Sequence, residues 1–246
     1  MLAQVVAALV SGWQLGRRRS VRQVENESLV AYQSWSIYRD SAYNESGFRD
    51  WEASAIATYF PKSGRVLVPS CGGGREVLAL ARSGFELVAF ECQPSFVVHC
   101  KDLLAKHEIP AQIFQAPPSE VAAEVRGMRF DAALVGWGGY MHIQHAQRRV
   151  AFLRDVRKMM PVGAPILISF FTRREQSKFF FIVYWVARVA KAISGSSLPV
   201  ERGDNMDGSF DHHFTSDEIR AECKAAGFEV LVFHQRPYGH VVARAT

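Results

Sequence analysis

The stretch "RVLVPSCGGGREVLALA", residues 65–81, joins an apolar run, a cluster of glycines and a second apolar run with helical spacing. The valine and leucine content of residues 65–70 predicts a short buried strand. Residues 74–84 predict a helix that ends at Gly84, because glycine is favoured just beyond a helix C-terminus. The three consecutive glycines, residues 72–74, lie between these elements. A turn without side chains lets a ligand approach the backbone closely, so the stretch predicts a binding turn.

The rest of the chain repeats the alternation of strand and helix. Strand patterns occupy residues 85–91, 111–115, 130–137 and 165–172, and helix patterns occupy residues 94–108, 144–160 and 215–227. Repeated strand–helix units imply an α/β fold with a doubly wound, mostly parallel sheet. The turn signal at residues 236–239 predicts that the last two strands, residues 228–235 and 239–245, pair antiparallel.

Two segments lie outside this alternation, residues 1–60 and about 173–212. Both are expected near the carboxyl ends of the strands, where open α/β sheets bind ligands. We therefore interpret them as a helical N-terminal extension and a lid insertion. The N-terminal segment offers four candidate lid aromatics, for which simple packing is the alternative role: Tyr32, Trp35, Tyr38 and Tyr43.

The apolar segment at residues 178–193 predicts a helix that is buried against the N-terminal helix, covers an apolar ligand, or contacts a membrane or partner. The composition of residues 194–208 is typical of a mobile loop.

Composition excludes several classes. The chain has 246 residues, 48% of them hydrophobic and 22% charged, which is ordinary for a soluble globular protein. The net charge of +5 is mild and forms no nucleic-acid-binding stripe. Four scattered cysteines fit free thiols in a reducing compartment, so we expect a cytoplasmic protein. Residues 1–15 are apolar, but their basic residues follow rather than precede, unlike a secretory signal. The sequence leaves the oligomeric state open, and a homodimer is one alternative.

The glycine turn discriminates between ligand types. A P-loop needs GxxxxGK and then Ser or Thr, but Gly74 is followed by Arg75 and Glu76. A dinucleotide turn needs GxGxxG, and here the third glycine is missing. The stretch "VLVPSCGGG" resembles the first motif, commonly "VLDLGCGTG", of the class I S-adenosylmethionine-dependent methyltransferases. The resemblance covers about residues 64–246, including the order of elements, and implies a methyltransferase domain at residues 61–246.

The resemblance implies S-adenosyl-L-methionine as the cofactor and S-adenosyl-L-homocysteine as its product. Glu91 stands where the family places an acid for the ribose hydroxyls, and a carboxylate makes strong charge-assisted hydrogen bonds there. An exposed strand-end residue is the alternative role for Glu91. The implied cofactor contacts lie in the turn, at two strand ends and after the fourth strand: Ser70, Cys71, Gly72, Gly74, Glu91, Cys92, Gln115, Gly136 and Trp137.

The chain departs from the family pattern at two positions of the first motif. Val68 replaces the usual acid and Ser70 replaces the first glycine. The sequence "VPSCG" is similar to the thiopurine methyltransferase branch, but the later motifs do not match that branch, so its substrate is not transferred.

Three residues are candidates for the chemistry. His142 and Tyr140 follow the fourth strand, in the loop where the family places substrate-side residues, and His213 precedes the last helix. His142 is the first choice for a general base or a substrate orienter, and capping of the following helix is its alternative role. No metal site is expected, because the nearby acids do not come from strand ends.

The sequence thus predicts a methyltransferase that acts on an oxygen or nitrogen of a small, partly hydrophobic or aromatic molecule, with oxygen favoured because a histidine base is available. Two alternatives remain: a peripheral membrane or lipid methyltransferase, and a non-catalytic cofactor-binding partner protein.

Overall fold

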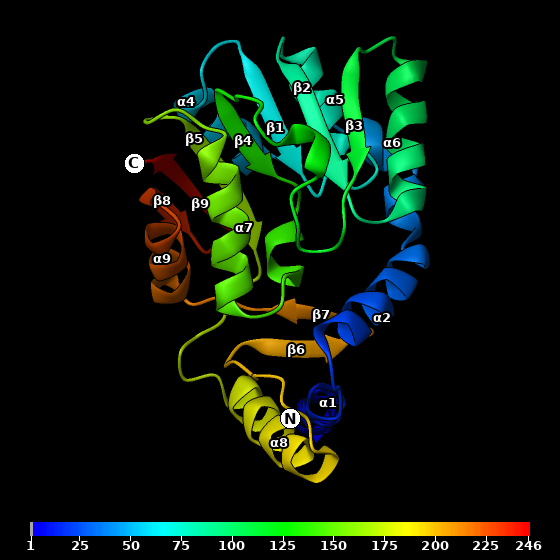
Figure 1. Cartoon of the computed structure of the whole chain (residues 1–246), viewed down its shortest axis with the longest axis vertical. Helices are drawn as coiled ribbons and strands as arrows, with labels where there is room; N and C mark the ends of the chain where they lie inside the picture. Colours follow the sequence, from blue (N-terminus) through cyan, green and yellow to red (C-terminus); the bar gives the residue numbers. More distant parts are fainter. Residues whose placement is uncertain (1) are drawn as a thin grey trace.

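The apolar strands pair into one central sheet. The computed structural model describes residues 2–246 and has a seven-stranded sheet of order β3-β2-β1-β4-β5-β9-β8 (Figure 1). The strands are β1 (Arg65–Pro69), β2 (Glu86–Glu91), β3 (Ala111–Gln115), β4 (Ala132–Val135), β5 (Pro165–Phe170), β8 (Phe228–His234) and β9 (Gly239–Ala245). Strands β1 to β5 pair in parallel, whereas β9 runs antiparallel to both β5 and β8. The predicted fold class is confirmed.

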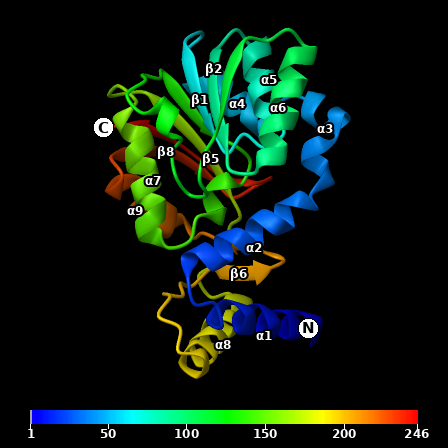
Figure 2. The ribbon, with the colours of Figure 1, turned by 45° about the vertical axis from the view of Figure 1, so that its right-hand side comes forward.

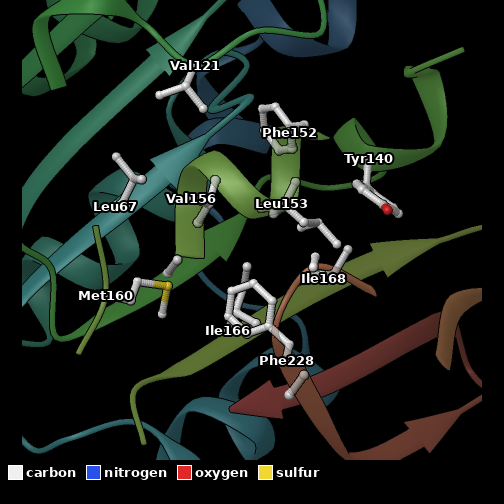
Figure 3. Packing of buried hydrophobic residues seen from close by; sticks show 14 of the residues in the cluster. Leu67, Val121, Tyr140, Phe152, Leu153, Val156, Met160, Ile166, Ile168 and Phe228 are labelled. Carbon is white, nitrogen blue, oxygen red and sulfur yellow. The ribbon is translucent and has the colours of Figure 1, made fainter. Parts of the chain in front are cut away.

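Helices cover both faces of this sheet because the central strands are apolar on both sides. Helices α4 (Asp50–Tyr59), α5 (Arg75–Arg82) and α6 (Pro94–Lys106) pack on one face. Helices α7 (Ala146–Lys158) and α9 (Ser216–Ala225) pack on the other. On that second face Phe152, Leu153 and Val156 of α7 interlock with Ile166 and Ile168 of β5 (Figure 3).

The remaining elements precede or interrupt the alternation. They are α1 (Leu2–Gly16), α2 (Val21–Gln33), α3 (Ser41–Glu45), α8 (Lys178–Ser194), β6 (Asp204–Asp207), β7 (Ser209–His212) and the 3₁₀ turns η1 (Ser36–Arg39), η2 (Ala123–Val125) and η3 (Gly139–His142). Strands β6 and β7 form a separate antiparallel hairpin. The expectation of a loop through residue 208 is therefore wrong for β6, whose short polar run "DNMD" carries no strand signal of its own.

Helices α1 and α8 pack side by side at the end of the molecule beyond the β6–β7 hairpin (Figures 1 and 2). The contact is close because α1 has glycine at two facing positions. A Cβ atom on Gly12 would lie 2.6 Å from the carbonyl oxygen of Val183, and one on Gly16 would lie 2.2 Å from that of Ala187. The expected packing of α8 on the N-terminal helix thus holds for one face of α8. Among residues 2–246, no helix combines the length and apolar content that a bilayer crossing requires.

Candidate active site

The turn after β1 adopts a left-handed backbone at three of its residues. Ser70, Gly72 and Gly74 adopt positive φ angles of 55°, 53° and 102°, a region that favours glycine. At Gly73 the constraint is space, since a Cβ atom would lie 1.9 Å from the carbonyl oxygen of Tyr38. The N-terminal segment therefore docks directly on the glycine turn.

Glu91 ends β2 beside this turn and is buried. Its Oε2 accepts a hydrogen bond from the backbone N–H of Gly72 at 3.0 Å. Its Oε1 accepts from the N–H groups of Cys92, at 2.7 Å, and Gln93, at 3.0 Å. Three donors hold the carboxylate in one orientation, and a carboxylate has lone pairs left for further donors. The alternative of an exposed strand-end residue is wrong for Glu91.

An open cavity lies beside Glu91, at the carboxyl ends of the parallel strands, and the space between its lining atoms, open solvent included, is about 930 Å³. Seven of the sequence-predicted site residues line it: Ser70, Cys71, Gly72, Glu91, Cys92, Trp137 and His142.

Aromatic side chains form one wall of the cavity. Tyr32 and Trp35 come from the N-terminal segment, with ring centroids 4.7 Å apart, and Tyr38 packs on Phe96 of α6 at 5.0 Å. Burial raises the pKa of Tyr32 and of Tyr38, so both phenols stay neutral. Of the four candidate lid aromatics, Tyr43 is the one that does not line the cavity; it packs behind Tyr38.

His142 lies among these aromatics, with its ring 5.5 Å from Tyr32 and 5.9 Å from Trp35. Its Nδ1 lies 2.7 Å from the carbonyl oxygen of Phe210 in β7. Because a carbonyl only accepts, Nδ1 carries the proton and Nε2 is the basic nitrogen. Burial lowers the pKa of His142, with the Phe210 hydrogen bond opposing, so the imidazole is neutral at pH 7. The expectation of a helix cap is not met, since His142 makes its bond to β7.

Glu76, in the first turn of α5, is a cavity residue that sequence reasoning missed. Its Oε1 accepts from Arg75, at 2.8 Å, and from the N–H of Trp137, at 3.1 Å. Arg75 also makes two bonds to Glu52, of 2.6 and 2.7 Å. Two carboxylates thus surround one guanidinium, which gives the three side chains a formal charge of minus one, and Glu76 is the member that lines the cavity. Burial raises the pKa of Glu76.

The far wall of the cavity also lacked a sequence signal. It is formed by α2 and by residues 116–120, which follow β3. Glu25 of α2 joins them through hydrogen bonds from Ser119, at 3.2 Å, and Arg148, at 2.7 Å. Such contacts span about a hundred residues and follow from the fold alone.

Five predicted residues do not line the cavity. Tyr140 is fully buried in the core (Figure 3), and its hydroxyl donates to Glu222 at 2.6 Å. His213 pairs with Asp211 at 2.8 Å. Gln115 is exposed, so residues 116–120 line the cavity instead. Gly74 is the N-cap of α5. Gly136 lets β4 approach the turn, as a Cβ there would lie 1.9 Å from the carbonyl oxygen of Ser70.

A separate polar cluster lies at the end of the hairpin where Asp204 of β6 pairs with His212 of β7. Ligand atoms of Glu201, Asp204 and His212 come within 4.8 Å of one another. Arg149 donates to Glu201 at 2.8 Å and His212 pairs with Asp204 at 2.8 Å. Arg149 of α7 thereby connects Glu201 of the insertion to Glu222 of α9.

Solved structures that are similar to this chain in fold include S-adenosylmethionine-dependent methyltransferases. The 1,6-didemethyltoxoflavin-N1-methyltransferase of Burkholderia thailandensis, solved with its substrate and S-adenosylhomocysteine, is 20% identical, with a TM-score of 0.61 over 90% of this chain and 89% of its own. A methyltransferase of Methanosarcina mazei is 16% identical, with a TM-score of 0.63 over 81% and 98%. An amino pentose methyltransferase of Micromonospora echinaspora is 16% identical, with a TM-score of 0.60 over 88% and 97%.

No protein-family model matches the sequence, and no curated protein matches it. At these identities the likeness establishes the fold, which is that of the class I methyltransferases.

Proposed function

We propose that the chain is an S-adenosylmethionine-dependent methyltransferase acting on an oxygen or nitrogen of a small, partly hydrophobic or aromatic molecule. The observation that carries this proposal is the buried carboxylate of Glu91, bonded to Gly72 of the glycine turn inside a cavity at the strand ends. Ligand sites of open α/β sheets lie at this edge.

The residues present fit the donor. Glu91 keeps acceptor capacity for the two ribose hydroxyls, in a position where charge-assisted bonds are strong. Glu76, in its net negative group, is suited to the ammonium of the amino acid tail. It takes over the task of the family acid that Val68 replaces, since Val68 is buried in the core. When bound, the sulfonium supplies an electrophilic methyl group.

The acceptor side follows from the aromatic wall and His142. Flat rings of Tyr32, Trp35 and Tyr38 favour a planar, apolar acceptor. A neutral imidazole with a basic Nε2 can take the proton that a hydroxyl loses on methylation, which favours oxygen. Because transfer is an in-line displacement, holding the acceptor in place contributes more than the base.

The test is calorimetry with S-adenosylhomocysteine, followed by transfer of labelled methyl from S-adenosylmethionine to a panel of phenols, hydroxylated heterocycles and amines. The proposal expects one binding site per chain and label in at least one acceptor. No binding at saturating ligand contradicts it. Binding without transfer across the panel instead supports the non-catalytic alternative.

A further inference from the structure

The outer faces of α1 and α8 are apolar and exposed. On α1 the exposed side chains recur every three or four residues: Leu2, Val5, Val6, Leu9, Val10 and Trp13. On α8 they recur every four residues: Phe181, Trp185, Val189 and Ile193. This spacing puts each set on one side of its helix. The buried sides of the two helices, which include Ala8, Val183 and Ala187, form one cluster with Met206 and Phe210 of the β6–β7 hairpin.

The pattern is unusual for a surface helix, which normally turns charged residues outward. Trp13 and Trp185 are each 47% exposed, whereas the other three tryptophans are partly buried. Apolar faces of this kind on two neighbouring helices mark an interaction surface. The two faces together are called the α1–α8 surface below.

Helix α8 and the segment that begins with α1 carry basic side chains and no acid. Residues 2–22 contain four arginines and no acid, and residues 178–194 contain three basic residues and no acid, which gives seven cations. Arg18 is paired with Glu27, but Arg17, Arg19 and Arg22 are exposed. Arg188 lies 5.1 Å from the ring of Trp185, so a cation flanks an exposed aromatic directly.

We propose that the α1–α8 surface docks on an anionic lipid bilayer. Exposed tryptophan and phenylalanine suit the interface between headgroups and acyl chains. An apolar helix face flanked by Arg and Lys is the composition of helices that lie in this interface. Anionic lipid headgroups complement the six cations other than the buried, paired Arg18, and each cation near such a surface adds to the attraction. A second copy of the chain would oppose these cations with identical ones, so it fits less well.

The experiment is flotation of the full chain with vesicles of neutral phosphatidylcholine and with vesicles that contain roughly 30% phosphatidylglycerol. We expect flotation with the anionic vesicles alone, and release at about 1 M salt, where screening shortens to about 3 Å. Flotation with neither vesicle, or equally with both, overturns the proposal.

A variant and a matched control locate the surface. Trp13→Gln with Trp185→Gln is expected to weaken binding to anionic vesicles by about tenfold or more, because two interfacial anchors are lost. The control is Val98→Gln with Val162→Gln, which changes two exposed apolar residues elsewhere and should bind like the native chain. Unchanged binding of the tryptophan variant contradicts the assignment.

Fluorescence quenching and light scattering provide two further tests of membrane binding. Brominated acyl chains in anionic vesicles should quench the fluorescence of the native chain, which needs no substitution. Light scattering tests the rival occupant: a dimer that the tryptophan variant separates, with no vesicle binding, assigns the surface to a second copy and overturns the proposal. The measurements do not depend on methyl transfer, so their failure is distinct from failure of the proposed function.

Discussion

The backbone N–H of Gly72 donates to Oε2 of Glu91 at 3.0 Å, which fastens the turn after β1 to the end of β2. One carboxylate thereby fixes the shape of the glycine turn and presents acceptors to the cavity. The two parts of the sequence signal, the glycines and the acid nineteen residues later, form one structural unit.

Replacing Glu91 separates these two tasks. Glu91→Ala should weaken binding of S-adenosylhomocysteine by about 1.5–3 kcal/mol, because bonds to a charged group are lost, and should lower the melting temperature because three N–H groups lose their acceptor. Glu91→Gln keeps one carbonyl acceptor and should lose less of both. Calorimetry and thermal melts on the two variants check this. Unchanged affinity in Glu91→Ala refutes a cofactor role.

Glu76 is expected to bind the amino acid tail rather than the nucleoside. Glu76→Gln should reduce the affinity for S-adenosylhomocysteine by about ten- to a hundredfold, since a charge-assisted bond to an ammonium is lost. The affinity for 5′-methylthioadenosine, which lacks that tail, should change little. Titration of both ligands into both proteins is the measurement. An equal loss for both ligands assigns Glu76 to general stability of the turn.

His142 predicts the pH dependence of the rate. A general base must be unprotonated, and burial places the pKa of His142 below its ordinary value of 6.5. The value of kcat/KM should therefore be flat above pH 6.5 and fall as the pH drops through that lowered pKa. In His142→Gln the rate should fall by a factor of about a hundred at most. The decrease of kcat/KM at acidic pH should also disappear. Persistence of this decrease in the variant means that another group titrates.

Gly73 tests how the N-terminal segment docks. Gly73→Ala places a methyl group against the carbonyl oxygen of Tyr38, and such overpacking costs about 1–3 kcal/mol. We expect a lower melting temperature together with weaker S-adenosylhomocysteine binding. Gly84→Ala is the matched control: Gly84 has a φ of 89° but no neighbour within 4 Å, so it should lose stability without losing affinity.

Single strands and helices of this structure can be predicted from the sequence, whereas contacts between distant segments cannot. Strand β4 is predictable from its continuous apolar run, and helix α5 from the helical spacing of its apolar residues and from Gly84 just beyond its end. Glu91 is predictable because it lies at a strand end after a glycine turn. Tyr140 appears equally well placed, two residues from His142, yet its side chain turns into the core and bonds to Glu222.

Residues that meet only through tertiary packing belong to no sequence motif that would identify them as site residues. Glu25 reaches Ser119 and Arg148 across more than ninety positions of sequence. Glu76 follows the turn immediately, but its direction toward the cavity depends on Trp137, which donates to it from the loop after β4. Strand β6 has one apolar residue, Met206, among its four, so its antiparallel pairing with β7 and not its composition defines it.

The most direct test of the central claim is a crystal structure of the chain with S-adenosylhomocysteine at saturating concentration. The account predicts that the ribose hydroxyls lie within hydrogen-bonding distance of the Glu91 carboxylate, with the amino acid tail toward Glu76. A structure in which the ligand is bound elsewhere, or in which this cavity stays empty, contradicts it.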